Sequence, residues 1–212
     1  AKEISPYRYV GVNFNSQGNP NLKPSDNYNF DLKWDFNPSP TELVSLTAFY
    51  KHIKEPISRI EVASAGGYLS YENISDCAIV AGVEVEIRKN LFVRPLSSAA
   101  NGMNKLSFGL NGSYIYTNAK MPLATVTTGS QLEGAAPWIA NFDLSHHFTR
   151  DERSFVNTLV LNYVSDKIYT IGTQGYQDIM ERGLVTLDFV SQARLNKYLS
   201  LNLKARNLLN PS

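Results

Sequence analysis

Strict alternation between large apolar and polar side chains marks one stretch near the N-terminus, Tyr28-Asn29-Phe30-Asp31-Leu32-Lys33-Trp34-Asp35-Phe36. Successive side chains of a β-strand point to opposite faces, so this segment has one apolar and one polar face. The period recurs along the chain, and we expect further strands at 43–53, 79–88, 104–117, 137–149, 154–166, 182–191 and 198–206. The repetition predicts an all-β, antiparallel up-and-down meander that forms part of a transmembrane β-barrel.

The same period assigns each strand side chain to a face of the predicted wall. We expect one set to face lipid, namely Phe30, Leu32, Trp34, Leu144 and Leu201. We expect a second set to face inward, namely Asp31, Lys33, Glu84, Glu86, Asp143 and Lys204. Inward charges of this kind line a wet interior or hold a plug. A general acid/base pair at Glu84 and Glu86 would need a pocket and a shifted pKa.

Composition and charge exclude several other classes of protein. The 212 residues carry a formal net charge of +1, so no broad basic surface for nucleic acid is expected. The mean hydropathy of −0.23 fits a barrel, because half of each strand faces inward. No apolar run approaches the roughly 20 residues of a membrane helix. The single cysteine, Cys77, excludes an internal disulfide framework.

The connections between the predicted strands differ in length at the two ends. Compact polar turns are expected at 37–42, 150–153 and 194–197, and long connections at 54–78, 118–136 and 167–181. We expect segment 89–103 to be a connection longer than the other turns, because it contains Pro95 and a run of small residues. Weaker strands are expected near Tyr7–Phe14 and Ile57–Val62. Short turns at one end and long loops at the other are typical of outer-membrane barrels.

Aromatic side chains gather near both ends of the predicted strands. Near the short turns lie Trp34, Phe36, Phe148 and Phe155, and near the long loops lie Tyr50, Tyr114, Tyr116, Trp138 and Tyr163. Two such belts are expected at the two membrane interfaces. A soluble β-sandwich is the alternative, since aromatics at strand ends can also cap a core. Runs long enough to cross a membrane favour the barrel, because typical strands have about 5–6 residues.

No catalytic or metal site is expected. His146 and His147 are adjacent in a predicted strand, so they point to opposite faces and cannot bind one metal together. Cys77 lies beside Asp76 with no histidine near it in sequence, so nothing indicates a catalytic thiol. No phosphate-binding glycine loop and no nucleophile elbow occurs, and we expect neither an enzyme nor a cofactor.

Ligand contacts are expected in the long loops, because loops on a rigid wall commonly carry recognition. The candidates are aromatic and polar residues of the first and third long loops: Arg59, Glu61, Tyr68, Tyr71, Tyr169, Gln174, Tyr176 and Gln177. The alternative for each of them is an ordinary solvated loop residue.

Several motifs occur in a specific order along nearly the whole chain, namely Gly18-Asn19-Pro20-Asn21-Leu22-Lys23-Pro24, Ala48-Phe49-Tyr50-Lys51-His52-Ile53-Lys54-Glu55-Pro56-Ile57, Gly82-Val83-Glu84-Val85-Glu86-Ile87-Arg88-Lys89, Leu132-Glu133-Gly134-Ala135-Ala136-Pro137-Trp138 and Ala205-Arg206-Asn207-Leu208-Leu209-Asn210-Pro211. Together they resemble the C-terminal part of the barrel of a TonB-dependent outer-membrane receptor. The likeness is greatest to receptors that carry a carboxypeptidase-regulatory-like domain before the plug.

The resemblance implies TonB-dependent uptake of a nutrient (siderophore, cobalamin, glycan or peptide) across the outer membrane of a Gram-negative bacterium. The implied partners are outer-membrane lipid, the protein's own plug domain and remaining barrel strands, TonB, and a small ligand. The alternative function is that of a structural or assembly subunit of a larger outer-membrane complex.

Strand count and flanking segments predict that residues 1–212 are one partial barrel domain. Receptors of this kind resemble the plugged transporters of about 22 strands, whereas eight or nine strands are expected here. We expect the plug, the TonB box and the final strands to lie outside these residues. No apolar run follows Ala1-Lys2-Glu3, so we also expect that a signal peptide was removed or that the chain begins within a longer protein.

Overall fold

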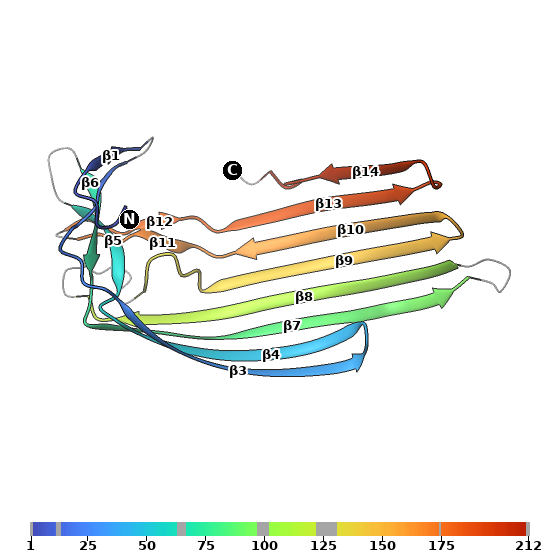
Figure 1. The fold of residues 1–212 in the computed structure, drawn as a ribbon, viewed down its shortest axis with the longest axis horizontal. Coiled ribbons are helices and arrows are strands. Elements are labelled where there is room, and N and C mark those ends of the chain that lie inside the picture. The colour runs from blue at the N-terminus through green and yellow to red at the C-terminus, as the bar shows by residue number, and fades with distance from the viewer. Residues whose placement is uncertain are drawn as a thin grey trace.

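A computed structural model describes residues 2–11, 14–62, 67–96, 102–121, 131–173 and 175–210. One antiparallel sheet, which we call the wall, contains eight strands: β3 (Asp26–Ser39), β4 (Glu42–Lys54), β7 (Cys77–Pro95), β8 (Gly102–Ala119), β9 (Trp138–Arg150), β10 (Arg153–Val164), β13 (Leu184–Arg194) and β14 (Ser200–Ala205). Each wall strand pairs with the next wall strand along the chain, from β3 at one edge to β14 at the other (Figure 1). The predicted all-β meander is therefore confirmed.

Six shorter strands lie at the end of the wall where the long connections are found (Figure 1). They are β1 (Arg8–Val10), β2 (Asn15–Gln17), β5 (Ile57–Val62), β6 (Tyr68–Asn73), β11 (Lys167–Thr170) and β12 (Ile179–Glu181). The order β1-β2-β6-β5 forms a second sheet, and β11 pairs with β12. Strand β5 has the predicted bounds. Among the described residues, no helix is long and apolar enough to cross a membrane.

The prediction for segment 89–103 is wrong for most of its length. Strand β7 continues to Pro95 and β8 begins at Gly102, so the connection is a short one. The extra residue Leu91 breaks the register between Asn90 and Phe92, and the pairing with β8 then resumes. A β-bulge of this kind adds one residue to a strand without ending its ladder. Pro95 is tolerated at the end of β7, because it is the last paired residue of the strand and the following amide, Leu96 N, donates to Gly102 O over 2.9 Å.

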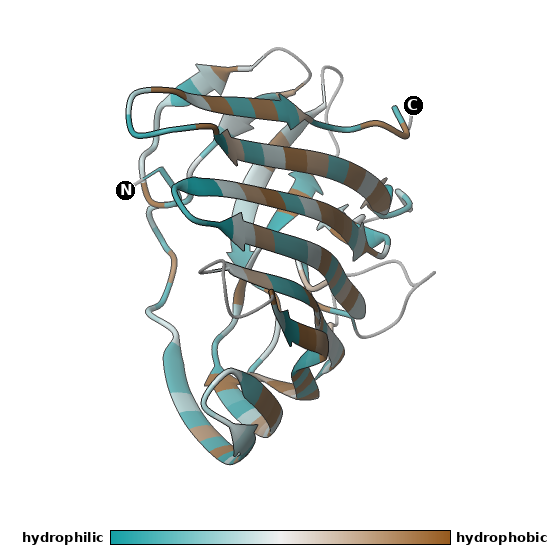
Figure 2. Ribbon diagram, turned by 90° about the vertical axis from the view of Figure 1, so that its right-hand side faces the viewer, coloured by the Kyte–Doolittle hydropathy of each residue, from teal (hydrophilic) through white to brown (hydrophobic). Residues whose placement is uncertain are grey.

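The register of the wall keeps apolar and polar side chains on separate faces. Residues directly opposite one another in antiparallel strands share a face. One row runs through Trp34, Leu46, Val85, Gly112, Ala140, Tyr163 and Val185. We call the face that carries this row the apolar face, and Figure 2 shows the alternation of hydropathy along the strands that produces it. The predicted lipid-facing set Phe30, Leu32, Trp34, Leu144 and Leu201 belongs to it.

The opposite face, the polar face, carries polar side chains at the same level on seven adjacent strands. This row runs through Asp35, Ser45, Glu86, Asn111, Asn141, Asn162 and Thr186. Its members hydrogen-bond to neighbours: Asn141 Nδ2 donates to Asn111 Oδ1 over 3.4 Å, and Asn162 Nδ2 donates to Thr186 Oγ1 over 3.0 Å. The set predicted to face inward lies on this face.

Two glycines of the polar face are covered by side chains of neighbouring strands. A Cβ at Gly82 would lie 2.4 Å from both the Phe49 ring and the Tyr114 carbonyl oxygen. A Cβ at Gly109 would lie 2.2 Å from a carboxylate oxygen of Asp143. The Phe49 ring therefore packs directly on the β7 backbone, which is how an aromatic side chain can stabilise a glycine in a sheet.

We expect Gly82→Ala to destabilise the wall by about 1–3 kcal/mol, because an added methyl group overpacks the contact with Phe49 and the Tyr114 carbonyl. Gly112→Ala is the matched control, since its Cβ would meet only the Ile139 carbonyl oxygen, at 4.0 Å. Urea unfolding of the intact barrel measures both variants. Equal stability of the two variants would contradict the packing at Gly82.

Candidate functional site

An apolar core joins the long loops to the polar face of the wall. Its buried members from the loops are Ile60, Ile74, Leu132, Ile168 and Ile171. On the wall, the core includes the cross-strand pair Ala78 and Ala119, both buried. Small side chains at this pair leave room for the loops to pack on the sheet. We call the assembly of β5, β6, β11, β12 and residues 131–136 the loop layer.

Backbone hydrogen bonds connect loops that are far apart in sequence. Ile60 and Ile171 form a parallel bridge, in which Glu61 N donates to Ile171 O and Ile171 N donates to Arg59 O, each over 3.1 Å. Gly134 N donates to Ile168 O over 2.8 Å. All three long connections are therefore joined to one another, and the loop layer is one unit.

Arg59 is the side chain on which the three connections converge. Its Nη2 lies 3.5 Å from Glu133 Oε1, and its Cζ lies 4.5 Å from the centre of the Tyr169 ring. The Arg59 amide also donates to Glu133 Oε2. The Phe14 ring lies 6.4 Å from the Tyr169 ring, which extends the cluster to the N-terminal segment. This arrangement joins a charge pair to a cation–π contact.

Electrostatics at this cluster are dominated by burial. The side chains of Arg59 and Glu133 are only 24% and 20% exposed. Burial raises the pKa of Glu133 above its ordinary value, and the hydrogen bond from the Arg59 amide and the charge of Arg59 offset that rise in part. The carboxylate is thus held by its partners in a site that disfavours its charge.

The structure brings some of the predicted ligand residues together and separates others. Arg59 pairs with Tyr71 across β5 and β6, and both lie in the unit that contains Tyr169. Tyr68 packs against Arg8, whose Cζ lies 5.1 Å from the ring centre. The Glu61 carbonyl accepts a hydrogen bond from Thr173 Oγ1 over 2.7 Å.

The remaining candidates follow β11. Tyr176 and Gln177 lie in an exposed turn near Gly172, where the Tyr176 amide donates to Thr173 O over 3.1 Å. Gln174 lies outside the described residues. Tyr176 and Gln177 therefore belong to the rim of the loop layer, whereas Arg59 lies at its centre.

Glu133 and Phe14 were not among the predicted site residues. Glu133 lies in the second long connection, where it is the only charged residue of the stretch Leu132-Glu133-Gly134-Ala135-Ala136. A lone carboxylate in an otherwise apolar and small stretch is a signal that it has a partner, since buried charges are paired. No local pattern marks Phe14, because its contact to Tyr169 depends on the tertiary fold.

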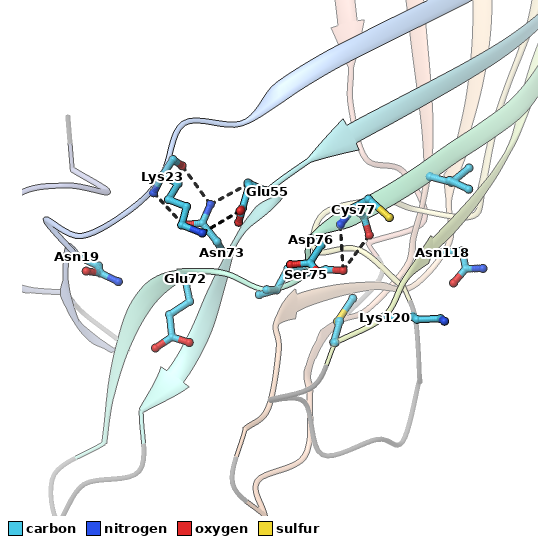
Figure 3. Close-up of a pocket in the computed structure, with 13 residues that line it drawn as sticks. Asn19, Lys23, Glu55, Glu72, Asn73, Ser75, Asp76, Cys77, Asn118 and Lys120 are labelled. Atoms are coloured by element: carbon cyan, nitrogen blue, oxygen red, sulfur yellow. Dashed lines mark hydrogen bonds and ion pairs between the residues drawn. The ribbon is translucent and has the colours of Figure 1, made fainter.

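An open pocket of about 910 Å³ lies where the loop layer meets β7 and β8. Figure 3 shows Lys23, Glu55 and Asn73 on one side and Cys77, Asn118 and Lys120 on the other. The lining combines polar side chains of both charges, with Glu72 and Asp76 among the acids, with the apolar side chains of Ile74, Ile79 and Met121.

Asn73 holds one side of this pocket together (Figure 3). Its Nδ2 donates to Lys23 O over 3.1 Å and to Glu55 O over 2.9 Å, and its Oδ1 accepts from Lys23 N over 2.9 Å. Lys23 Nζ in turn lies 2.9 Å from Glu55 Oε1, and this carboxylate raises the pKa of the ammonium group. Three distant segments are thereby fixed by one amide side chain.

Within the described residues, no group of three histidine, cysteine or acidic side chains could hold a metal ion. His146 pairs with Asn157 and His147 with Val156, so the two imidazoles lie on opposite faces as expected. Cys77 is exposed, and its amide hydrogen-bonds to Ser75 Oγ over 3.3 Å. None of these contacts resembles a catalytic constellation.

An antiparallel wall with one apolar face, one polar face and its long loops at one end is the architecture of a membrane β-barrel. A family model described as TonB dependent receptor-like, beta-barrel, matches residues 3–208, and the chain belongs to this family. The match confirms the resemblance of the sequence to a receptor barrel, and the family is one of transporters. Comparisons with curated proteins and with solved structures gave no match.

We expect Arg59→Gln to loosen the loop layer by about 1–3 kcal/mol, because the Glu133 carboxylate then stays in its half-buried site without a cation. Hydrogen exchange at the Gly134 amide measures this opening free energy. The Glu86 amide in the wall is the internal control and should keep its protection. An unchanged Gly134 amide would show that the charge pair does not hold the layer.

The same junction predicts a dependence on pH. Because burial raises the pKa of Glu133, its contribution to loop stability is full below the pKa of the unfolded chain and is lost as pH rises through the raised pKa. Opening free energies at Gly134, corrected for intrinsic exchange, should therefore fall with rising pH across that range. Glu133→Gln should flatten the profile, and a profile that persists in this variant would assign the titration to another group.

Proposed function

We propose that the chain is a wall segment of an outer-membrane receptor that takes up a small nutrient with energy from TonB. The observation that carries the proposal is the two-faced wall in a chain of the TonB-dependent receptor-like family. Catalysis is not part of the proposal, because the described residues of the site offer recognition groups and no paired nucleophile and base.

The apolar face fits a lipid environment. Leu32 is 76% exposed and Phe30 is 65% exposed, as are many large apolar side chains along the same rows. A water-soluble protein rarely exposes a continuous apolar patch of this extent. Aromatic pairs flank the patch at both ends. The ring centres of Tyr114 and Trp138 lie 4.5 Å apart near the loops, and those of Phe148 and Phe155 lie 6.3 Å apart near the turns. Belts of this kind support insertion between two membrane interfaces.

The polar face fits the lumen of a plugged barrel. Its seven-strand polar row offers amide, hydroxyl and carboxylate groups over a broad area. A plug domain of the same protein is the partner that such a surface suits, since it can satisfy these groups together with water.

The two edges of the wall indicate a larger barrel. Among the described strands, β3 and β14 each pair on one side only. Unpaired backbone groups are not tolerated in the hydrocarbon region, so an open sheet needs further strands there. We propose that additional strands of the same protein close the barrel, in a receptor that also carries a carboxypeptidase-regulatory-like domain and a plug.

Ligand capture is proposed at the loop layer. Arg59, Glu61, Tyr71 and Tyr169 form its centre, and Tyr68, Tyr176 and Gln177 extend toward its rim. Aromatic and charged side chains on a well-packed base suit the recognition of siderophores, cobalamin, glycans or peptides. The interlocked backbone keeps this surface in one conformation, which lowers the entropic cost of binding.

The membrane location predicts an asymmetry between adjacent positions. Leu110→Arg should destabilise the folded barrel by about 2–4 kcal/mol, because it places a charge near the middle of the apolar face. Asn111→Arg, on the polar face, should cost much less. Folding titrations of the intact receptor in lipid vesicles measure both. An equal loss of folding free energy in the two variants would show that the two faces of the wall are wrongly assigned.

Uptake provides the direct test of function. Deletion of the complete gene should abolish growth on at least one limiting nutrient among iron–siderophore, cobalamin, glycans and peptides. The Arg59→Gln variant, expressed at the normal level, should weaken uptake of that nutrient. Normal uptake of every candidate, together with a defect in outer-membrane assembly, would instead support the structural role.

A further inference from the structure

We propose that the short-turn end of the apolar face carries a binding site for the phosphate of an anionic phospholipid headgroup. We call this site the turn-end patch; it consists of Arg94, Asn104, His146, Arg150 and Arg153, with the rings of Phe92, Phe148 and Phe155. The inference rests on the proposed membrane location, and it adds a specific lipid to the general contact with the bilayer.

The register brings the cations of this patch to the apolar face. Arg94 pairs with Asn104, and Asn104 pairs with Phe148, so all three share one row. Arg150 is two residues beyond Phe148 on the same face and pairs with Arg153 of β10. The bulge at Leu91 places Phe92 and Arg94 on this face, because its extra residue shifts the alternation of β7 by one position after Asn90.

Polar side chains adjoin these cations at a depth where apolar residues would be expected. His146 Nε2 lies 2.9 Å from Asn104 Oδ1. On the next strands, Ser191 Oγ donates to Asn157 Oδ1 over 2.7 Å. Asn157 pairs with His146 across β9 and β10, so the four side chains are continuous. Polar groups on a lipid-facing surface are costly in hydrocarbon, and they are expected where headgroups reach the protein.

The rings place the patch at the membrane interface. The rings of Phe148 and Phe155 lie side by side across β9 and β10, tilted by 44° with their centres 6.3 Å apart. They lie between the His146–Asn157 pair and the Arg150–Arg153 pair. Arg94 Cζ lies 5.4 Å from the centre of the Phe92 ring. An arginine beside an interfacial ring has its charge at headgroup level and its stem along the apolar surface.

Spacing allows the arginines to act on one phosphate. Arg94 and Phe148 are two strand spacings apart, about 10 Å, and Arg150 lies about 7 Å further along β9. The long side chains of Arg94 and Arg150 can converge across this gap, and all three arginines are exposed. Guanidinium groups bind phosphate in a bidentate manner, and the Asn104 amide adds a neutral donor.

The acidic side chains near the turn-end patch neutralise only part of its positive charge. Arg150 Nε lies 3.9 Å from Asp151 Oδ2 in the exposed turn, and Glu152 follows in the same turn. Glu42 accepts hydrogen bonds from the Asn90 amide and Ser39 Oγ, so its carboxylate is already engaged. The loop end of the apolar face differs, because the acidic residue Asp26 lies directly opposite Lys54 across β3 and β4. Charge complementarity to an anionic lipid is therefore specific to the turn end.

The experiment compares lipids on the intact receptor purified in detergent. Phosphatidylglycerol and phosphatidylcholine are titrated separately, and bound lipid is counted by native mass spectrometry. The variant Arg94→Gln/Arg150→Gln/Arg153→Gln should bind phosphatidylglycerol about tenfold or more weakly, because each basic residue adds to the attraction of an anionic lipid. Its phosphatidylcholine binding should stay within about twofold.

Two matched controls remove a cation elsewhere. Lys54→Gln lies at the loop end of the apolar face, and Arg88→Gln lies on the polar face of β7, where Arg88 pairs with Glu86 at 2.8 Å. Both should keep the affinity for phosphatidylglycerol. A comparable loss in either control, or an equal loss for both lipids in the triple variant, would overturn the proposal.

Two further outcomes separate the possible sources of failure. Displacement of phosphatidylglycerol by millimolar inorganic phosphate would show a site for the free anion and would overturn the lipid assignment. Failure of the intact receptor to insert into vesicles would contradict the proposed membrane function itself. Normal insertion without any preference for phosphatidylglycerol over phosphatidylcholine would reject only the turn-end patch.

Discussion

Backbone pairing across eight strands is the constraint on which every other feature of this molecule depends. Because the side-chain period of a strand is two residues, one register decides the face of every residue in all neighbouring strands. The ladder from β3 to β14 keeps one face rich in aromatic and aliphatic groups and the other rich in amides and carboxylates. Gly82 contributes to the packing of the wall, because the absence of a side chain lets the Phe49 ring lie against its backbone.

The loop layer uses the same pairing rules at a smaller scale and adds side chains that join distant segments. Buried Ile60 and Ile171 supply the apolar contact, their backbones supply the bridge, and Arg59 links the remaining connection through Glu133. Each link alone is modest, since a half-buried ion pair and a few hydrogen bonds contribute little individually. Their combination turns three loops into a surface that can keep recognition groups in fixed positions, which is what a receptor needs.

Much of the wall could be predicted from the sequence. The alternation at Tyr28–Phe36 and its repeats directly indicate on which face of the sheet each side chain lies. The short strands β2, β6, β11 and β12 could not, since three to six residues hold too little pattern and are stabilised by partners far away in the chain. The candidate site was predicted in part for the same reason. Arg59 and Tyr169 stand out as polar and aromatic loop residues, whereas the role of Glu133 depends on a loop approaching from another pair of strands.

In the described part of the wall, the bulges lie only near the short turns, and this limits how related chains can change in length. Beside the extra residue at Leu91, the β3–β4 hairpin also has an irregular register between Phe36 and Ser39. Insertion or deletion of one residue can be absorbed at these two places, where the ladder already accommodates an unpaired residue. In the described middle of the wall, a single insertion would exchange the two faces for the rest of that strand. Natural length variation in the central wall should therefore occur in steps of two residues, and single-residue gaps should cluster beside the turns.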